Sequence, residues 1–145
     1  MPALTDIKQG LAQLLLSDGN IGGMISQRVF FSVVPQNAVY PCICIIQISR
    51  ETFAHLQGVS GAALTWLQVD SYGNSDKEAT DLDELVRLAI LPVPSPAMGG
   101  IVVHETTDVN SRDVPIPPKD GSQQWRHCRQ HDFTIIHDQA IPVRR

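Results

Sequence analysis

The sequence has few charged residues, few aromatic residues and no long apolar run. Charged side chains make up 18% of the 145 residues and aromatic ones 6%, against 43% for hydrophobic residues as a whole. A chain with so little charge has apolar surface available for partners. No run approaches the roughly 18 to 20 apolar residues that span a bilayer, and the first six residues lack the basic start of a secretory signal. We therefore expect one domain over residues 1–145, made in the cytoplasm and without a membrane partner.

Signatures of catalysis and of phosphate binding are also missing. There is no Gly-x-Ser-x-Gly turn and no phosphate-binding glycine loop before a predicted helix. Cys42 and Cys44 lie in an apolar run, which raises the pKa of a thiol and lowers its reactivity. Three cysteines cannot all pair with one another, and Cys128 lies in a distant segment, so we expect reduced thiols in the core. The sequence predicts neither an enzyme nor a cofactor.

Three histidines near the end of the sequence are the candidates for a metal site. His127, His131 and His137 share parity on a predicted strand, so their side chains project from one face. Residues four apart on a strand lie about 13 Å apart, too far for both to reach one zinc ion at about 2 Å. Cys128 and Asp132 point to the opposite face. We expect no metal, and a small metal- or thiol-dependent enzyme is kept only as an alternative function.

The charge balance is acidic, with 11 basic and 15 acidic side chains and a formal net charge of −4. This argues against a protein that neutralises nucleic-acid phosphates. A nucleic-acid-binding regulator would show strongly salt-dependent DNA affinity, which this charge balance does not predict. Asp81, Asp83 and Glu84 on a predicted helix are interpreted as a solvated acidic face. Arg126 and Arg129 are interpreted as partners in local or intersubunit ion pairs.

The first half of the sequence predicts two helices and two strands. Helical spacing covers residues 4–16, with Thr5 or Asp6 as the cap and Asp18-Gly19 as the end. Residues 20–39 contain glycine and proline without a period, which indicates a loop with a short extended piece at 28–32. The strands are predicted at residues 41–53 and 62–72, joined by a hairpin turn at 57–61. Ser75-Asp76-Lys77-Glu78 has the form of a capping box and opens a helix to Ile90.

The second half predicts two more strands around a breaker-rich arm. Prolines 92, 94 and 96 end the second helix. Strands are predicted at residues 100–110 and 125–137, and the prolines and Gly121 between 110 and 124 indicate a long exposed arm. The predicted fold class is α+β, with a four-stranded antiparallel sheet, two helices on one face and the order α-β-β-α-β-β.

Three stretches of the chain together carry a resemblance to one known family. They are Ile25–Phe30 leading to Val34-Pro35-Gln36-Asn37-Ala38-Val39-Tyr40-Pro41-Cys42-Ile43, then Leu67–Ser75 followed directly by the capped helix Lys77–Leu82, and the final strand His131–Ile136. Together with the amphipathic helix Ile7–Leu15, they are similar to the tail terminator, or tail completion, proteins of long-tailed phages.

The resemblance implies a ring, usually a hexamer, that sits on the end of the tail tube, stops its polymerisation and joins it to the head connector. Its partners would be other copies of the chain, the tail tube protein and the connector protein. Genome DNA would pass through the lumen without specific binding, helped by an acidic lumen that repels phosphates. This implies a location in the tail or neck of the virion. Another neck component, such as an adaptor or stopper, is the alternative.

A ring subunit needs two different, complementary surfaces, and we expect them in the loop 20–39 and in the arm 110–124. Trp125 adds a large amphipathic side chain of the kind that anchors interfaces. The predicted interface residues are Arg28, Phe30, Gln36, Arg112, Asp113, Ile116, Lys119, Asp120, Trp125 and Arg126.

Overall fold

The computed structural model describes residues 6–55, 58–118 and 124–139. Within them the helices are α1 (Ile7–Ser17), α2 (Gly19–Ile25) and α3 (Asp76–Ile90), and the strands are β1 (Val29–Phe31), β2 (Cys42–His55), β3 (Gly58–Gly73), β4 (Val103–Ile116) and β5 (Arg126–Asp138). None of these described helices is both long and apolar enough to cross a membrane.

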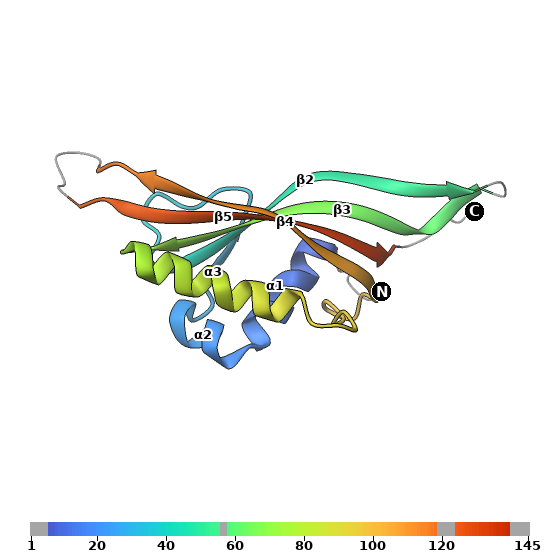
Figure 1. Ribbon diagram of the computed structural model, residues 1–145, viewed down its shortest axis with the longest axis horizontal. Coiled ribbons are helices and arrows are strands. Elements are labelled where there is room, and N and C mark those ends of the chain that lie inside the picture. The colour runs from blue at the N-terminus through green and yellow to red at the C-terminus, as the bar shows by residue number, and fades with distance from the viewer. Residues whose placement is uncertain (1–5, 56–57, 119–123, 140–145) are drawn as a thin grey trace.

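The strands form one mixed sheet in the order β1-β2-β3-β5-β4 (Figure 1). β1 runs parallel to β2, and every other neighbouring pair is antiparallel. The prediction of a four-stranded antiparallel sheet with two helices is therefore wrong, although the chain is α+β. The additional strand is β1, which lies in the predicted loop 20–39, within the short extended piece predicted at residues 28–32. A strand of three residues is too short to show a period in the sequence.

The additional helix, α2, lies in the same stretch. Three of its seven residues are glycine, and each glycine costs about 1 kcal/mol of helix propensity relative to alanine, so the sequence indicates a loop. Asp18 both ends α1 and caps α2, because its carboxylate accepts the amide hydrogens of Asn20 (2.9 Å) and Ile21 (3.2 Å). Ile21 and Ile25 are fully buried. Burial of these two side chains outweighs the poor local propensity.

The two helices that the sequence predicts, α1 and α3, are confirmed together with their caps. Asp6 caps α1, accepting from the Gln9 amide at 2.9 Å, and the Gln9 side chain accepts from the Asp6 amide. Ser75 caps α3 by accepting from the Glu78 amide at 3.1 Å. The Glu78 carboxylate reaches the amide of Asn74 at 2.9 Å, one residue before the position that the capping box predicts.

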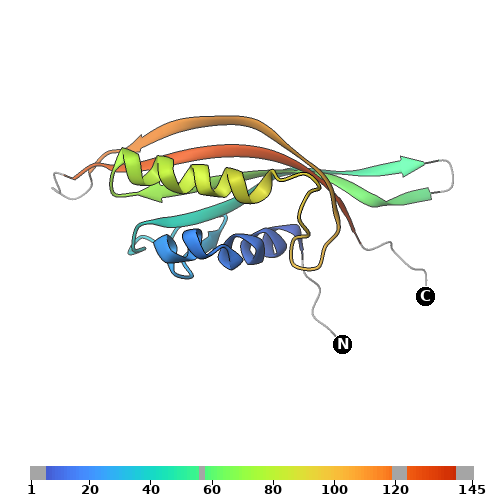
Figure 2. The same cartoon turned by 60° about the horizontal axis from the view of Figure 1, so that its bottom comes forward.

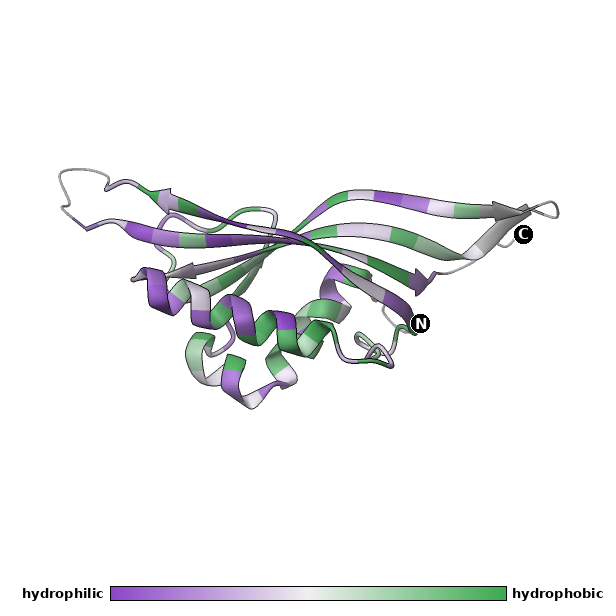
Figure 3. Ribbon diagram, in the orientation of Figure 1, coloured by the Kyte–Doolittle hydropathy of each residue, from purple (hydrophilic) through white to green (hydrophobic). Residues whose placement is uncertain are grey.

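All three helices lie on one face of the sheet (Figures 1 and 2). The core fills the space between that face and the helices. In Figure 3, α3 alternates along its length between hydrophobic and hydrophilic residues, as expected for a helix with one buried side. The fully buried large side chains of this core are Leu11, Leu15, Ile21, Ile25, Ile43, Ile45, Leu67, Leu82, Ile90, Met98, Phe133 and Ile135.

β4 is longer than predicted, and the arm is correspondingly shorter. Residues 110–116 belong to β4 and pair with β5 up to Ile116 and Arg126. Pro115 does not end the strand, because β4 is at the edge of the sheet, where a missing amide hydrogen is tolerated. The expectation that the arm begins at residue 110 is therefore wrong. The rest of the arm includes residues 119–123, which lie outside the described residues.

β2 and β3 extend beyond the helical layer (Figures 1 and 2). We call residues 51–55 and 58–64 of this hairpin the wing. Register shifts in β2 between Gln47 and Ser49 and between Thr52 and Ala54 bend the strand in this region. The wing and the β4–β5 connection lie at opposite ends of the sheet.

Candidate interaction surfaces

The register divides the strand residues between two faces. Ile45, Val69 and Phe133 point to the helices and belong to the core, and their neighbours along each strand point the other way. We call this second surface the open face, because no helix of the described residues covers it (Figure 1). The open face and the two sheet edges are the surfaces on which a partner has direct access to the strands.

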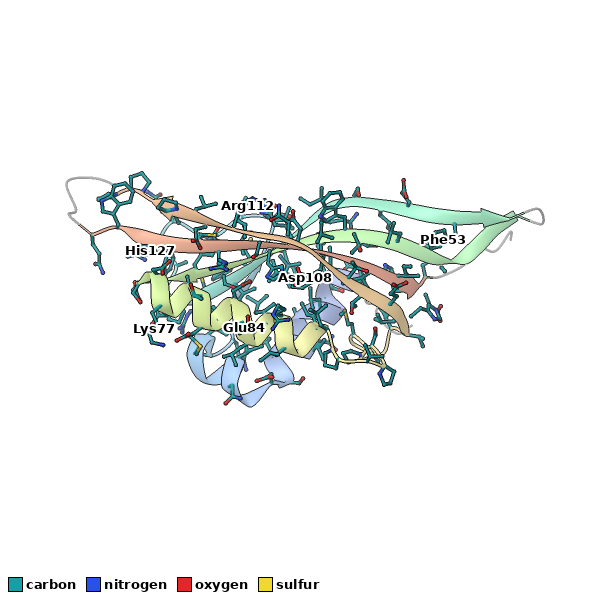
Figure 4. All side chains as sticks on the ribbon, in the orientation of Figure 1. Phe53, Lys77, Glu84, Asp108, Arg112 and His127 are labelled. Atoms are coloured by element: carbon teal, nitrogen blue, oxygen red, sulfur yellow. The ribbon has the colours of Figure 1, made fainter. Side chains whose placement is uncertain are left out.

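Four polar side chains form a network in the middle of the open face. Arg112 on β4 donates hydrogen bonds to the carboxylate of Asp132 (3.2 Å) and the side-chain oxygen of Gln68 (3.1 Å), and Gln68 donates to Asp70 (2.8 Å). Burial raises the pKa of the Asp70 carboxyl, and the Gln68 hydrogen bond and the Arg112 charge oppose that shift. Figure 4 shows Arg112 on the side of the sheet away from α3. Arg112 is thus engaged within its own subunit.

The three cysteines share the open face. Cys42 and Cys128 lie on either side of Tyr72, with which each is paired in register, and Cys44 lies two residues further along β2. All three are buried free thiols. Burial raises the pKa of Cys42 to about 11 and those of Cys44 and Cys128 to about 12. Thiols in this state are poor nucleophiles.

The loop 32–41 and the β4–β5 connection meet at one end of the sheet. The rings of Tyr40 and Tyr72 lie 5.5 Å apart, and the Arg126 guanidinium lies 4.3 Å from the centre of the Tyr40 ring. Trp125 is 51% exposed beside it, and Ile116 pairs with Arg126. We call Tyr40, Ile116, Trp125 and Arg126 the end surface. It brings Tyr40, the residue directly after the predicted loop 20–39, together with Ile116, Trp125 and Arg126, which are three of the predicted interface residues.

The predicted residues of the loop 20–39 differ in exposure. Arg28 donates to the carbonyl oxygens of Met24 (3.2 Å) and Pro41 (3.0 Å), so it ties α2 to the start of β2. Phe30 is half-buried in β1 opposite Cys44. Gln36 is exposed. Of these residues, Gln36 is the most accessible to a partner.

In the predicted arm, Asp113 is exposed but pairs with Arg129 of its own subunit at 3.2 Å. Lys119 and Asp120 lie outside the described residues. The interface role of the predicted residues stays a prediction. Tyr40 was not predicted as an interface residue, since only the fold brings it to Arg126.

A buried ionic cluster links β5, β4 and α3 on the helix side. His131 is 2% exposed, and its ring nitrogens lie 2.8 Å from Asp83 of α3 and 2.7 Å from Asp108 of β4. Figure 4 shows Asp108 between the sheet and α3. The ring stacks on Phe133 with centroids 4.2 Å apart. Burial opposes the charged imidazole, but the hydrogen bonds to both carboxylates outweigh it and raise the pKa of His131.

Two carboxylate partners require both ring nitrogens of His131 to donate, which only the imidazolium does. Arg129 adds a second cation, 3.8 Å from Asp83. The cluster therefore ties the edge strand β4 to α3. The sequence did not reveal it, because Asp83 was interpreted as solvated whereas it is buried.

His137 is buried on the same face but in a different environment. Its Nε2 lies 2.7 Å from the Thr65 hydroxyl, and its Nδ1 lies 2.8 Å from the carbonyl oxygen of Asp138. Burial lowers the pKa of His137, so the neutral ring donates to Asp138 and accepts from Thr65. His131 and His137 thus have separate partners. Among the described residues, no group of three or more histidine, cysteine or acidic side chains is placed to hold a metal ion.

Comparison with known proteins finds a likeness in fold alone. No protein-family model matches the sequence, and no curated protein matches it. Among solved structures, a chain from the virion of a native gene transfer agent particle superposes with a TM-score of 0.56 at 10% sequence identity. The likeness covers 88% of this chain and 91% of that chain.

Proposed function

We propose that this protein is a structural component of a phage-like virion. The observation that carries the proposal is the likeness to a chain of the gene transfer agent virion, which extends over nearly the whole of both chains. Two chains that match over almost their full lengths have the same overall fold. Function is not fixed by fold, so the geometry of the surfaces has to support the same role.

The sheet supports it with two different free edges. At one side β4 pairs only with β5 among the described strands, and at the other β1 covers only Ile43–Ile45 of β2. Long free edges invite contacts with other chains. Because the two edges differ, a contact between one edge and the other joins copies head to tail, and such contacts close into a ring when the rotation permits.

In the finer form of the proposal, the ring caps the tail tube, ends its polymerisation and offers a surface to the head connector. The end surface is the contact to those neighbours. Its exposed Trp125 and its Arg126, held against Tyr40, are side chains typical of interface anchors. Each copy contributes a formal net charge of −4, so a lumen lined by acidic residues would let DNA pass without binding.

Removal of the gene from a particle-producing strain tests the proposal. Tails of uncontrolled length, seen by electron microscopy, are the expected result for a tube cap. Tails of normal length beside unattached filled heads would instead indicate an adaptor or stopper of the neck. Fully assembled, infectious or DNA-delivering particles in normal yield would contradict both forms.

Substitutions in the end surface test the proposed role as a cap of the tail tube. Trp125→Ala with Arg126→Ala should leave the fold intact and prevent joining or capping. Lys8→Ala with Gln13→Ala, on α1, is the matched control and should assemble normally. Normal assembly of the end-surface variant would remove this surface from the proposal.

A further inference from the structure

Most of β2 is a free edge among the described strands. β1 pairs only with Ile43–Ile45. The Ile43 amide donates to the Arg28 carbonyl oxygen. The Ile45 carbonyl oxygen accepts from the Ser32 amide. The side chains of both isoleucines belong to the core on the helix side. Side-chain face and backbone direction both alternate with period two along a strand, so at this edge the helix-side residues present their backbone groups outward.

Beyond β1, the outward residues of β2 are Gln47, Arg50 and Thr52. One extra residue at Ile48 shifts the alternation by one position. The β3 partners of Arg50 and Thr52 are fully buried on the helix side, which fixes the face of these two residues. All three outward residues are exposed, and none is a proline. This edge therefore offers amides as well as carbonyls to an added strand.

β4 forms the opposite edge of the sheet and follows the same rule. Two strands, β3 and β5, lie between β2 and β4, so the alternation again directs the backbone groups of the helix-side residues outward. The outward residues in the second half of β4 are Ser111, Asp113 and Pro115. Only Pro115 lacks an amide hydrogen at this edge. The two edges thus present their backbone groups on matching faces.

The charges of the two edges are complementary in one antiparallel register. Residues that oppose each other across a strand pair project from the same face. When Arg50 of one copy lies opposite Asp113 of another, Glu51 lies opposite Arg112. The first pair is on the helix side and the second is on the open face, and each joins opposite charges. Arg50 now donates to the side chain of Gln139, which is uncharged.

Both charged residues of β4 have room for a second partner. Arg112 donates to Asp132 and Gln68, but its side chain is 40% exposed and a guanidinium has five N–H donors. The Asp113 side chain is 63% exposed and contacts Arg129 through Oδ1. A carboxylate has about four acceptor positions on its two oxygens. The contacts within the subunit therefore do not prevent the contacts between copies.

The same register also matches the uncharged residues. The remaining opposed pairs each share a face, with the bulged Ile48 left out: Thr52 with Ser111, Ser49 with Val114, Gln47 with Pro115, and Ile46 with Ile116. A shift by two residues places Glu51 opposite Asn110 or Val114 and removes both ion pairs. Pairing of β2 with a second β2 gives no such pairs, because Arg50 and Glu51 lie on opposite faces.

We propose that β4 of one copy adds to the free edge of β2 of a neighbouring copy, with Arg50 opposite Asp113 and Glu51 opposite Arg112. The two sheets then form one continuous sheet. This deepens the proposed function, on which it rests, by naming the contact that joins the copies. Each copy gives one edge and receives another, which is a head-to-tail contact of the kind that closes rings.

Disulfide trapping tests the register directly. Thr52 and Ser111 would be a hydrogen-bonded pair with Cα atoms about 5.5 Å apart, which suits a disulfide. Thr52→Cys chain and heavy-isotope-labelled Ser111→Cys chain are mixed in concentrated solution under mild oxidation, and mass spectrometry counts the mixed disulfide. We expect it to form at least about tenfold faster than with Ser17→Cys, an exposed control position on α1. A rate no higher than that of the control would overturn the proposal.

Reversal of one ion pair within the same assay tests the charges. Arg50→Glu in the Thr52→Cys chain, or Asp113→Arg in the Ser111→Cys chain, should each slow the mixed disulfide about fivefold. Both changes together restore opposite charges and should restore the rate. Slowing without recovery, or no slowing by either change, would show a different contact and contradict the proposal. The assay uses the purified chain alone, so absence of the chain from virions would be a separate result that bears on the proposed function.

Discussion

Replacement of His131 by glutamine should destabilise the protein far more than its single side chain suggests. In the native protein, the imidazolium donates to Asp83 and Asp108, and Asp83 is 3% exposed. Glutamine leaves the buried Asp83 carboxylate with Arg129 at 3.8 Å as its nearest cation. Breaking a buried pair by removing one partner costs about 3 to 5 kcal/mol.

We expect His131→Gln to lower the free energy of unfolding by about 3 kcal/mol, the lower limit of this range, because Arg129 remains close to Asp83. For a chain of this size, that corresponds to a fall in Tm of roughly 10 °C. His104→Gln is the matched control, since His104 and Asp138 form an ion pair in which both side chains are about half exposed. Such exposed pairs contribute less than about 1 kcal/mol.

The pH dependence of stability gives a second, independent reading of the same cluster. The pKa of His131 is raised in the folded state, so its stabilising contribution is complete below the unfolded value of about 6.5 and is lost as pH rises through the folded pKa. Urea unfolding from pH 6 to pH 8 should show a larger fall in the native protein than in His131→Gln, because the three buried thiols, whose pKa values are also raised, lower the stability of both proteins equally as pH rises. A native unfolding free energy that does not change over that range, or a His131→Gln variant as stable as His104→Gln, would refute the reasoning.

Three further predictions follow from particular contacts. Gly10→Ala should lower the free energy of unfolding by about 2 kcal/mol through overpacking, because the new Cβ would lie 2.3 Å from the Met98 carbonyl oxygen. The Cβ of Gly23→Ala meets nothing within 4 Å, so this variant should be neutral or stabilising, and urea unfolding compares the two. The three thiols should react with a disulfide reagent at pH 8 about 100-fold more slowly in the native state than in denaturant, because burial raises their pKa values, and equal rates would be inconsistent with burial. Arg126→Ala should lower the free energy of unfolding by about 0.5 to 1 kcal/mol through loss of the contact between Arg126 and Tyr40. Thermal melts of this variant and of Arg126→Lys, which keeps the charge, measure the difference.

Local signals were enough to predict the longer elements of the fold. The capped helix α3 and the apolar strand β2 follow from a capping serine, helical spacing and alternation along the chain. α2 was missed because its glycines indicate a loop. β1 lies within the short extended piece predicted at residues 28–32, but three residues are too few to predict that it joins the sheet. The extent of β4 was misjudged because Pro115 is tolerated only at a sheet edge, and the sequence does not say which strand is at the edge.

The surfaces were less predictable than the elements. Trp125 and Arg126 were identified from residue type, yet Tyr40 joins them only through the packing of the loop 32–41 against β5. Surfaces that cross the sheet depend on the register of several strand pairs: Glu51 and Glu105 are 54 residues apart in sequence and lie on one face only in the fold. The bridging role of His131 likewise requires α3 and β4 to be brought to its two nitrogens.

The copy number of this chain in purified particles tests the central claim most directly. Particles from the strain that encodes the chain are purified through a density gradient, washed at high salt, treated with nuclease and analysed by quantitative mass spectrometry against the other virion proteins. A virion structural protein is expected at a fixed, small number of copies per particle that survives the wash, consistent with a ring. Its absence from washed particles, while it is abundant in the producing cells, would contradict the account.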